Sequence, residues 1–160
     1  MCAQTQGEQE ECWRLRILLS KCICAQGDFA KSVTLLETAP IGEDVSIEIR
    51  ARVLNQRGFG LSRSGNLVGA KEALDAARSL ETAAGSPAFV AEIEINRSTL
   101  FFYLAKHDEV ETCARTALVI GEKQKLPMVE ASACAGMGKS HMYRERQADA
   151  IPWFERALAL

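Results

Sequence analysis

The chain has 160 residues, of which 48% are hydrophobic and 25% are charged. This is enough apolar surface for a folded core, and the length fits one domain or a short array of repeats. The 19 Lys and Arg residues nearly balance the 21 Asp and Glu residues, so the net charge of −2 lacks the basic excess that neutralises phosphates in nucleic-acid binders. We therefore expect no nucleic acid among the partners.

The N-terminal segment 1–12 is polar and acidic, which is untypical of a signal peptide. We expect it to be a tail or the start of the first helix. No apolar run in the sequence approaches the ~18 residues of a membrane span, so we expect no membrane partner. These features favour a cytoplasmic setting; the alternative is an exported parent protein whose signal has been removed from the sequence.

Four segments of the chain, at 20–39, 58–77, 98–117 and 138–157, align with one another. Each begins with a small residue and ends with alanine, and the successive alanines are 38, 40 and 40 residues apart. Two further positions, seven and three residues before the alanine, are small or apolar. We call these four the packing positions, and they hold Ser20, Ser32, Leu36 and Ala39; Gly58, Ala70, Leu74 and Ala77; Ser98, Val110, Ala114 and Ala117; and Gly138, Ala150, Phe154 and Ala157.

The spacing of the packing positions predicts two antiparallel helices in each segment. Steps of three and seven place the last three positions on one helical face, where small side chains let two helices approach closely. On this basis we expect Ala77 and Ala117 to be buried and Glu81 to be exposed. Turn signals within the segments stand at 26–28, at 64–66 and, more weakly, at 106–108. Helix-end signals between the segments stand at Pro40, 85–87 and 126–127.

This pattern resembles the tetratricopeptide repeat family, from about Trp13 to Leu160. The period of about 40 residues exceeds the family's usual 34, and the longer form is similar to repeats in bacterial ATPase-type transcriptional activators and caspase-like CHAT-domain proteins. The phrase at 150–158 is most similar to the latter. The resemblance implies an all-α fold, a right-handed superhelical solenoid of about four helical hairpins, with units at about 13–40, 44–84, 87–124 and 127–160.

The resemblance also implies that the first helix of each unit lines a concave groove for a protein or peptide. Basic and amide side chains there would bind a peptide backbone or carboxylate, and aromatic side chains would supply apolar contact. The alternative is that the aromatic residues pack between helices and the basic ones form a solvated face. The candidate groove residues are Arg52, Asn55, Phe59, Arg63, Glu92, Thr99, Phe102, Tyr103, Lys139 and Tyr143, and the same stripe includes Arg14, Ile17, Lys21, Cys24, Ile95, Ser132, Ala135 and Met142.

Nothing in the sequence predicts a catalytic site or a cofactor. The segment 136–140 ends like a phosphate-binding loop, but Ala133 stands where such a loop needs glycine, and no strand precedes it. Cys134 and His141 are two helical turns apart, roughly 10 Å, which is too far for a nucleophile and its base. We therefore expect no enzyme activity.

The six cysteines are predicted to be structural. None forms a C-x-x-C pair, and Cys22 and Cys24 would point about 200° apart around a helix, so they cannot share a metal ion. We expect buried, reduced thiols that act as small hydrophobic residues, with no disulfide and no metal.

These observations favour a scaffold for protein–protein interaction, as a fragment of a larger regulatory protein. Two alternatives stay open: an oligomerisation module or structural spacer, and a regulatory segment of a multidomain enzyme such as a caspase-like CHAT protease. Solenoids need polar caps on their terminal repeats. The last helix instead carries Ile151, Trp153, Phe154 and Leu158, so we also expect self-association through this end.

Overall fold

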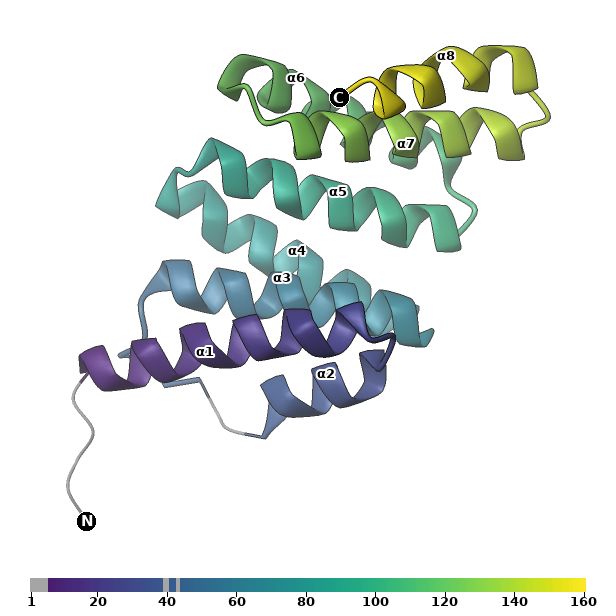
Figure 1. The fold of residues 1–160 in the computed structure, drawn as a ribbon. Helices are drawn as coiled ribbons and strands as arrows, with labels where there is room; N and C mark the ends of the chain where they lie inside the picture. Colours follow the sequence, from purple (N-terminus) through teal and green to yellow (C-terminus); the bar gives the residue numbers. More distant parts are fainter. Residues whose placement is uncertain (1–5, 39–40, 43) are drawn as a thin grey trace. The chain divides into compact units, whose positions relative to one another are not determined.

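The computed structural model describes residues 6–38, 41–42 and 44–160, and within them it is helical, with no strand (Figure 1). Cys2, Ala39 and Pro40, which the sequence patterns involve, lie outside the described residues. The helices are α1 (Gln6–Ala25), α2 (Phe29–Glu37), α3 (Ile47–Ser64), α4 (Leu67–Ala84), α5 (Pro87–Tyr103), α6 (His107–Gln124), α7 (Pro127–Tyr143) and α8 (Gln147–Leu158). The prediction of an all-α protein is confirmed.

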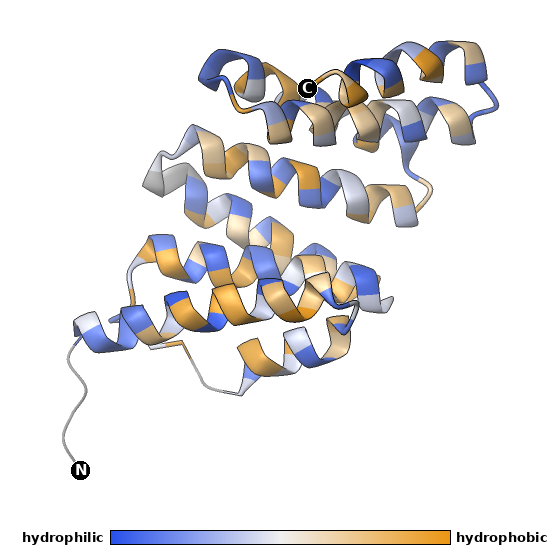
Figure 2. Ribbon diagram, in the orientation of Figure 1, coloured by the Kyte–Doolittle hydropathy of each residue, from blue (hydrophilic) through white to orange (hydrophobic). Residues whose placement is uncertain are grey.

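The chain divides into two compact units, Met1–Gly85 and Ser86–Leu160. The first unit contains the hairpins α1–α2 and α3–α4, and the second contains α5–α6 and α7–α8. Within each unit, the first helix of the second hairpin contacts both helices of the first hairpin. Apolar and polar residues are interleaved along the helices (Figure 2), as expected when one face of each helix packs against its neighbours.

The helix ends around 64–66 and 85–87 follow the predicted chemistry. Gly65 and Gly85 end α3 and α4 in the left-handed conformation, with φ of 92° and 75°. Asn66 caps α4, accepting a hydrogen bond from the Gly69 N–H at 3.0 Å. Ser86 caps α5 and Pro87 takes its first position. These are local preferences of glycine, asparagine, serine and proline, so the sequence alone predicts them.

The third turn lies two residues earlier than the predicted 106–108. Helix α5 ends at Tyr103 and α6 already begins at His107. The turn uses Ala105 in the left-handed conformation, with φ of 54°. Asp108 therefore belongs to the first turn of α6, where a carboxylate is favourable because of the helix dipole.

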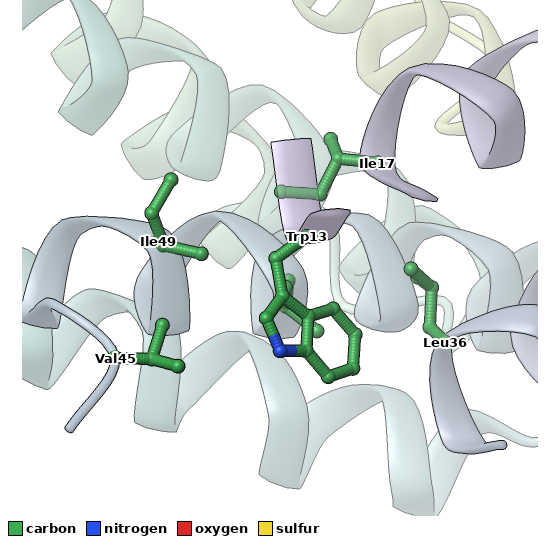
Figure 3. Close-up of a cluster of buried hydrophobic side chains, with 6 residues drawn as sticks. Trp13, Ile17, Leu36, Val45 and Ile49 are labelled. Carbon is green, nitrogen blue, oxygen red and sulfur yellow. The ribbon is translucent and has the colours of Figure 1, made fainter. Parts of the chain in front are cut away.

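The core of the first unit surrounds a buried tryptophan. Figure 3 shows the indole of Trp13, from α1, among apolar side chains that come from α1, α2, α3 and Val45, which precedes α3. Burying one such side chain stabilises the fold by about 1.5–3 kcal/mol, so this cluster holds α3 against the first hairpin. The buried members are Trp13, Ile17, Leu36, Val45, Ile49 and Val53.

The packing positions among the described residues lie at the helix contacts, as predicted. Ala70, Ala77, Ala114 and Ala117 are completely buried, and Phe154 and Ala157 of α8 are half-buried. The expectation that Glu81 is exposed is wrong, because its exposed fraction is 0%. Glu81 stands four residues after Ala77, and a step of four returns to the same face of a helix.

The four hairpins fill the point of closest approach in different ways. The Ser20 and Ser32 hydroxyls share a hydrogen bond of 2.7 Å in α1–α2, and Ser98 donates to the Val110 carbonyl at 3.3 Å in α5–α6. In the other two hairpins the first helix has glycine. A Cβ atom on Gly58 would lie 2.5 Å from Leu74 Cγ, and one on Gly138 would lie 2.8 Å from the Phe154 ring.

Candidate partner-binding surfaces

Three predicted groove residues of the second unit come together as an aromatic cluster, which we define as Phe102, Tyr103 and Tyr143. The rings of Phe102 and Tyr143 meet edge to face, with centroids 4.8 Å apart and an interplanar angle of 88°. The Phe102 and Tyr103 centroids are 6.0 Å apart. Phe102 is half-buried, whereas Tyr103 is 41% and Tyr143 60% exposed.

The repeat explains why these rings meet. Tyr103 and Tyr143 are the last residues of α5 and α7, and both stand five positions after the first packing position of their segment, Ser98 or Gly138. Because α7 packs against α5, the ends of these two helices lie close enough for Phe102 of α5 to contact Tyr143 of α7. The half-buried Phe102 contacts both tyrosine rings.

The polar candidates of the second unit differ in how available they are. Lys139 is exposed one turn before Tyr143, so its ammonium group can reach a ligand beside the aromatic cluster. The Thr99 hydroxyl is used inside its own helix, where it donates to the Ile95 carbonyl at 3.1 Å. Glu92 is half-buried and interacts with other residues of the protein.

The first unit has a smaller patch, built from Phe29, Phe59 and Arg63. The rings of Phe29 and Phe59 meet edge to face, with centroids 6.2 Å apart. The Arg63 guanidinium carbon lies 4.8 Å from the Phe29 centroid, a cation–π arrangement. Phe29, which directly follows the predicted turn at 26–28, is not among the predicted site residues.

Two other candidates of α3 have internal roles. Asn55 is 1% exposed, so we leave it out of the surface. It stands three residues before Gly58 and therefore shares the packing face of α3. Arg52 is half-buried and pairs with Glu48 one turn earlier, at 3.0 Å.

The rest of the predicted stripe divides between surface and interior. Of the α1 candidates, Ile17 and Cys24 are buried, whereas Arg14 and Lys21 are exposed. Ser132 and Ala135 of α7 line a hollow against α8, which is a different surface from the aromatic cluster.

The cysteines differ from the prediction that all are buried. Cys24, Cys113 and Cys134 are buried, but Cys12 and Cys22 are exposed, and all five described thiols are free. Burial, with the Glu94 carboxylate as a second cause, raises the pKa of Cys113 to about 12. Burial also raises the pKa of Cys134. These two thiols stay protonated at neutral pH, which makes them poor nucleophiles.

The phosphate-loop-like segment 136–140 lies inside α7. Its backbone N–H groups belong to the helix and do not form a loop that could surround a phosphate. Among residues 6–38, 41–42 and 44–160, no three His, Cys, Asp or Glu side chains gather as a metal site. No helix in the described part of the chain is long and apolar enough to cross a membrane.

The sequence matches no model of a known protein family and no curated protein.

Proposed function

We propose that the protein is a scaffold that binds a peptide segment of another protein through the aromatic cluster of the second unit. The observation that supports this most is the exposure of Tyr103 and Tyr143 beside the half-buried Phe102. Tyrosine supplies a large apolar face with a polar end, and such residues are enriched among the few that dominate binding energy at interfaces.

The ring contacts favour this role for a second reason. Phe102 holds Tyr143 edge to face, so the tyrosine is already oriented before a partner arrives. Binding to an ordered side chain loses less conformational entropy than binding to a mobile one. Lys139, exposed one turn away, would attract a carboxylate. The ligand that fits is a peptide in which apolar and acidic side chains are interleaved.

The patch of the first unit offers the same kinds of group, with Arg63 in place of the lysine. There, however, the Phe59 ring packs against the Phe29 ring, and the Arg63 guanidinium lies over the Phe29 ring. Truncating Phe59 would therefore disturb the patch itself, and a loss of binding would have two explanations. The exposed tyrosines of the second unit give the cleaner test.

The test is selection of binding peptides from a random library on the purified protein, followed by affinity measurement for one enriched peptide. We expect acidic and apolar residues to be enriched. Tyr143→Ala should weaken the peptide by more than ~1 kcal/mol, about fivefold. Lys139→Ala should cost less and reduce the dependence of affinity on salt, because an exposed charge is screened. Val119→Ala, at an exposed apolar residue elsewhere in the second unit, is the matched control.

Both binding variants should keep the helical circular dichroism of the wild type, since neither side chain is buried. The proposal fails if the selected peptide binds Tyr143→Ala and Tyr103→Ala as tightly as the wild type. It also fails if Val119→Ala weakens binding as much as Tyr143→Ala does.

A further inference from the structure

A hollow of about 420 Å³ lies between α7 and α8 and is lined by small and apolar residues. Helix α8 also exposes large apolar side chains: Leu158, which lines the hollow, is 89% exposed, and Ile151 is more than half exposed. The residues of the hollow are Ala131, Ser132, Ala135, Phe154, Ala157 and Leu158.

The second unit itself indicates what fits this hollow. All six lining residues stand 40 positions after residues of α5 and α6. Ser132 corresponds to Glu92, and the other five correspond to the small or apolar residues Ala91, Ile95, Ala114, Ala117 and Leu118. Those five form the surface that α7 covers. Ala133 and Cys134 of α7 share a core cluster with Ala91, Ala117 and Leu118, and Gly136 faces Ala114. The α7–α8 hairpin thus repeats a surface that already holds a helix inside the same unit.

A helix of this chain carries the complementary face. On α1, Leu15, Leu18 and Leu19 are each more than half exposed, and Cys22 is exposed. Steps of three and four residues place the four on one stripe of the helix.

The stripe on α1 occupies the repeat positions through which α3 contacts the α1–α2 hairpin and α7 contacts the α5–α6 hairpin. Counted from the first packing position, Leu18 and Cys22 of α1 correspond to Gly136 and Ser140 of α7. Gly136 lies against Ser98 and Ala114, and the Ser140 hydroxyl donates to Glu111 at 3.0 Å.

In the first unit, the equivalent residues of α3 likewise contact the preceding hairpin, α1–α2. There the corresponding residues of α3 are Gln56 and Gly60. Gln56 donates to the sulfur of Cys24 at 3.5 Å, and a Cβ atom on Gly60 would lie 2.8 Å from Val33. In both units, therefore, these positions face the hairpin before them.

The two free faces also match in chemistry. Inside the second unit, the contact at one repeat position is polar, between Ser140 and Glu111. The corresponding residues on the free faces are Cys22 and Ile151, which form an apolar pair. Both partners of the polar contact are thus replaced by apolar residues, Ser140 by Cys22 and Glu111 by Ile151. This is expected if the α1 face and the α8 face contact each other.

We propose that α1 of one copy docks in the α7–α8 hollow of a second copy, with Leu15, Leu18 and Leu19 entering the space beside Phe154 and Leu158. The two faces are different, so the association is head to tail. It does not stop at a symmetric dimer and instead builds chains or closed rings. The proposal is independent of the peptide-binding surface, because none of its residues belongs to the aromatic cluster.

Sedimentation velocity across a wide concentration range tests this. The wild type should form species that grow with concentration. Leu18→Glu on the stripe and Leu158→Glu at the hollow should each weaken association more than tenfold. Both positions are exposed, so the helical circular dichroism should not change. Val119→Glu, exposed but on neither face, should associate like the wild type.

A mixture of Leu18→Glu and Leu158→Glu is the decisive sample. Each variant keeps the face that the other has lost, so the mixture should form a one-to-one complex and nothing larger. The proposal is overturned if the wild type stays monomeric, if either variant still self-associates like the wild type, or if the mixture stays monomeric.

Discussion

The hairpins α1–α2 and α5–α6 carry serine where their helices come closest, whereas α3–α4 and α7–α8 carry glycine. In the serine hairpins the buried hydroxyl of Ser20 or Ser98 is satisfied by a hydrogen bond across the contact. In the glycine hairpins the space of the missing side chain is filled by Leu74 or Phe154. The contact is therefore stabilised in two ways, by a hydrogen bond from a serine hydroxyl or by a large side chain packed against a glycine.

The two solutions have different costs. A buried hydroxyl requires a partner, which restricts the facing residue but leaves the helix intact. Glycine inside a helix costs about 1 kcal/mol relative to alanine, and the burial of the facing side chain offsets this. Substitutions at the two kinds of contact should therefore behave differently.

The largest effect is expected at the large partner of a glycine. Leu74 is completely buried, and Leu74→Ala should lower the free energy of unfolding by about 2–5 kcal/mol, because it leaves a cavity over Gly58. Urea unfolding followed by circular dichroism measures the change. Val68→Ala, at an exposed position of the same helix, should stay within about 0.5 kcal/mol. Equal losses for the two variants would rule out the packing register.

Alanine at the glycines is the next test. Gly58→Ala should cost about 1–3 kcal/mol through overpacking against Leu74, in spite of the better helix propensity. Gly138→Ala should cost less, because the half-buried Phe154 borders the open hollow and can shift.

In the double variant Gly58→Ala/Leu74→Ala the clash disappears, so its loss should be smaller than the sum of the two single losses. If Gly58→Ala stabilises the protein, propensity outweighs packing and the proposed difference between the hairpins is wrong.

A pH effect on stability is expected from the buried Cys113, in the serine hairpin α5–α6. Its pKa is about 12, raised from 9.0 by burial, so between these pH values the unfolded chain loses a proton that the folded chain keeps. The stability from the neutral thiol is complete below pH 9 and is lost as the pH rises toward 12.

The slope should be on the order of 1.4 kcal/mol per pH unit. Urea unfolding at pH 8, 9 and 10 should show a shallower decline for Cys113→Ala than for the wild type. Parallel declines would contradict the assignment.

The smallest effect is expected at a serine. Ser20→Ala removes one hydrogen bond and should cost about 0.5–1.5 kcal/mol. The loss stays modest because Ser32 keeps a second contact, with Cys24 Sγ at 3.0 Å. Ser20→Gly should cost about 1 kcal/mol more than Ser20→Ala, from helix propensity alone. Urea midpoints compared across the two variants check the order, and a more stable Ser20→Gly would reverse it.

Errors in the sequence-based predictions have two causes. The turn at Ala105 was placed too late because it contains no glycine or proline to mark it. Glu81 is expected at the surface and Asn55 in the groove stripe that the resemblance implies, although their spacing from Ala77 and Gly58 puts both on packing faces. Helical phase was the better guide at both positions, since a helix buries whatever stands on the face that its neighbour covers.

The sequence by itself determined the all-helical character, the repeat, most helix ends and the small residues at the contacts, because propensity, capping and periodicity act over a few residues. Only the tertiary structure decided that Phe102 and Tyr143 touch, that Cys22 is exposed while Cys24 is buried, and that a hollow remains between α7 and α8. Each of these depends on which helix covers which face, and that is set by packing between residues far apart in the chain.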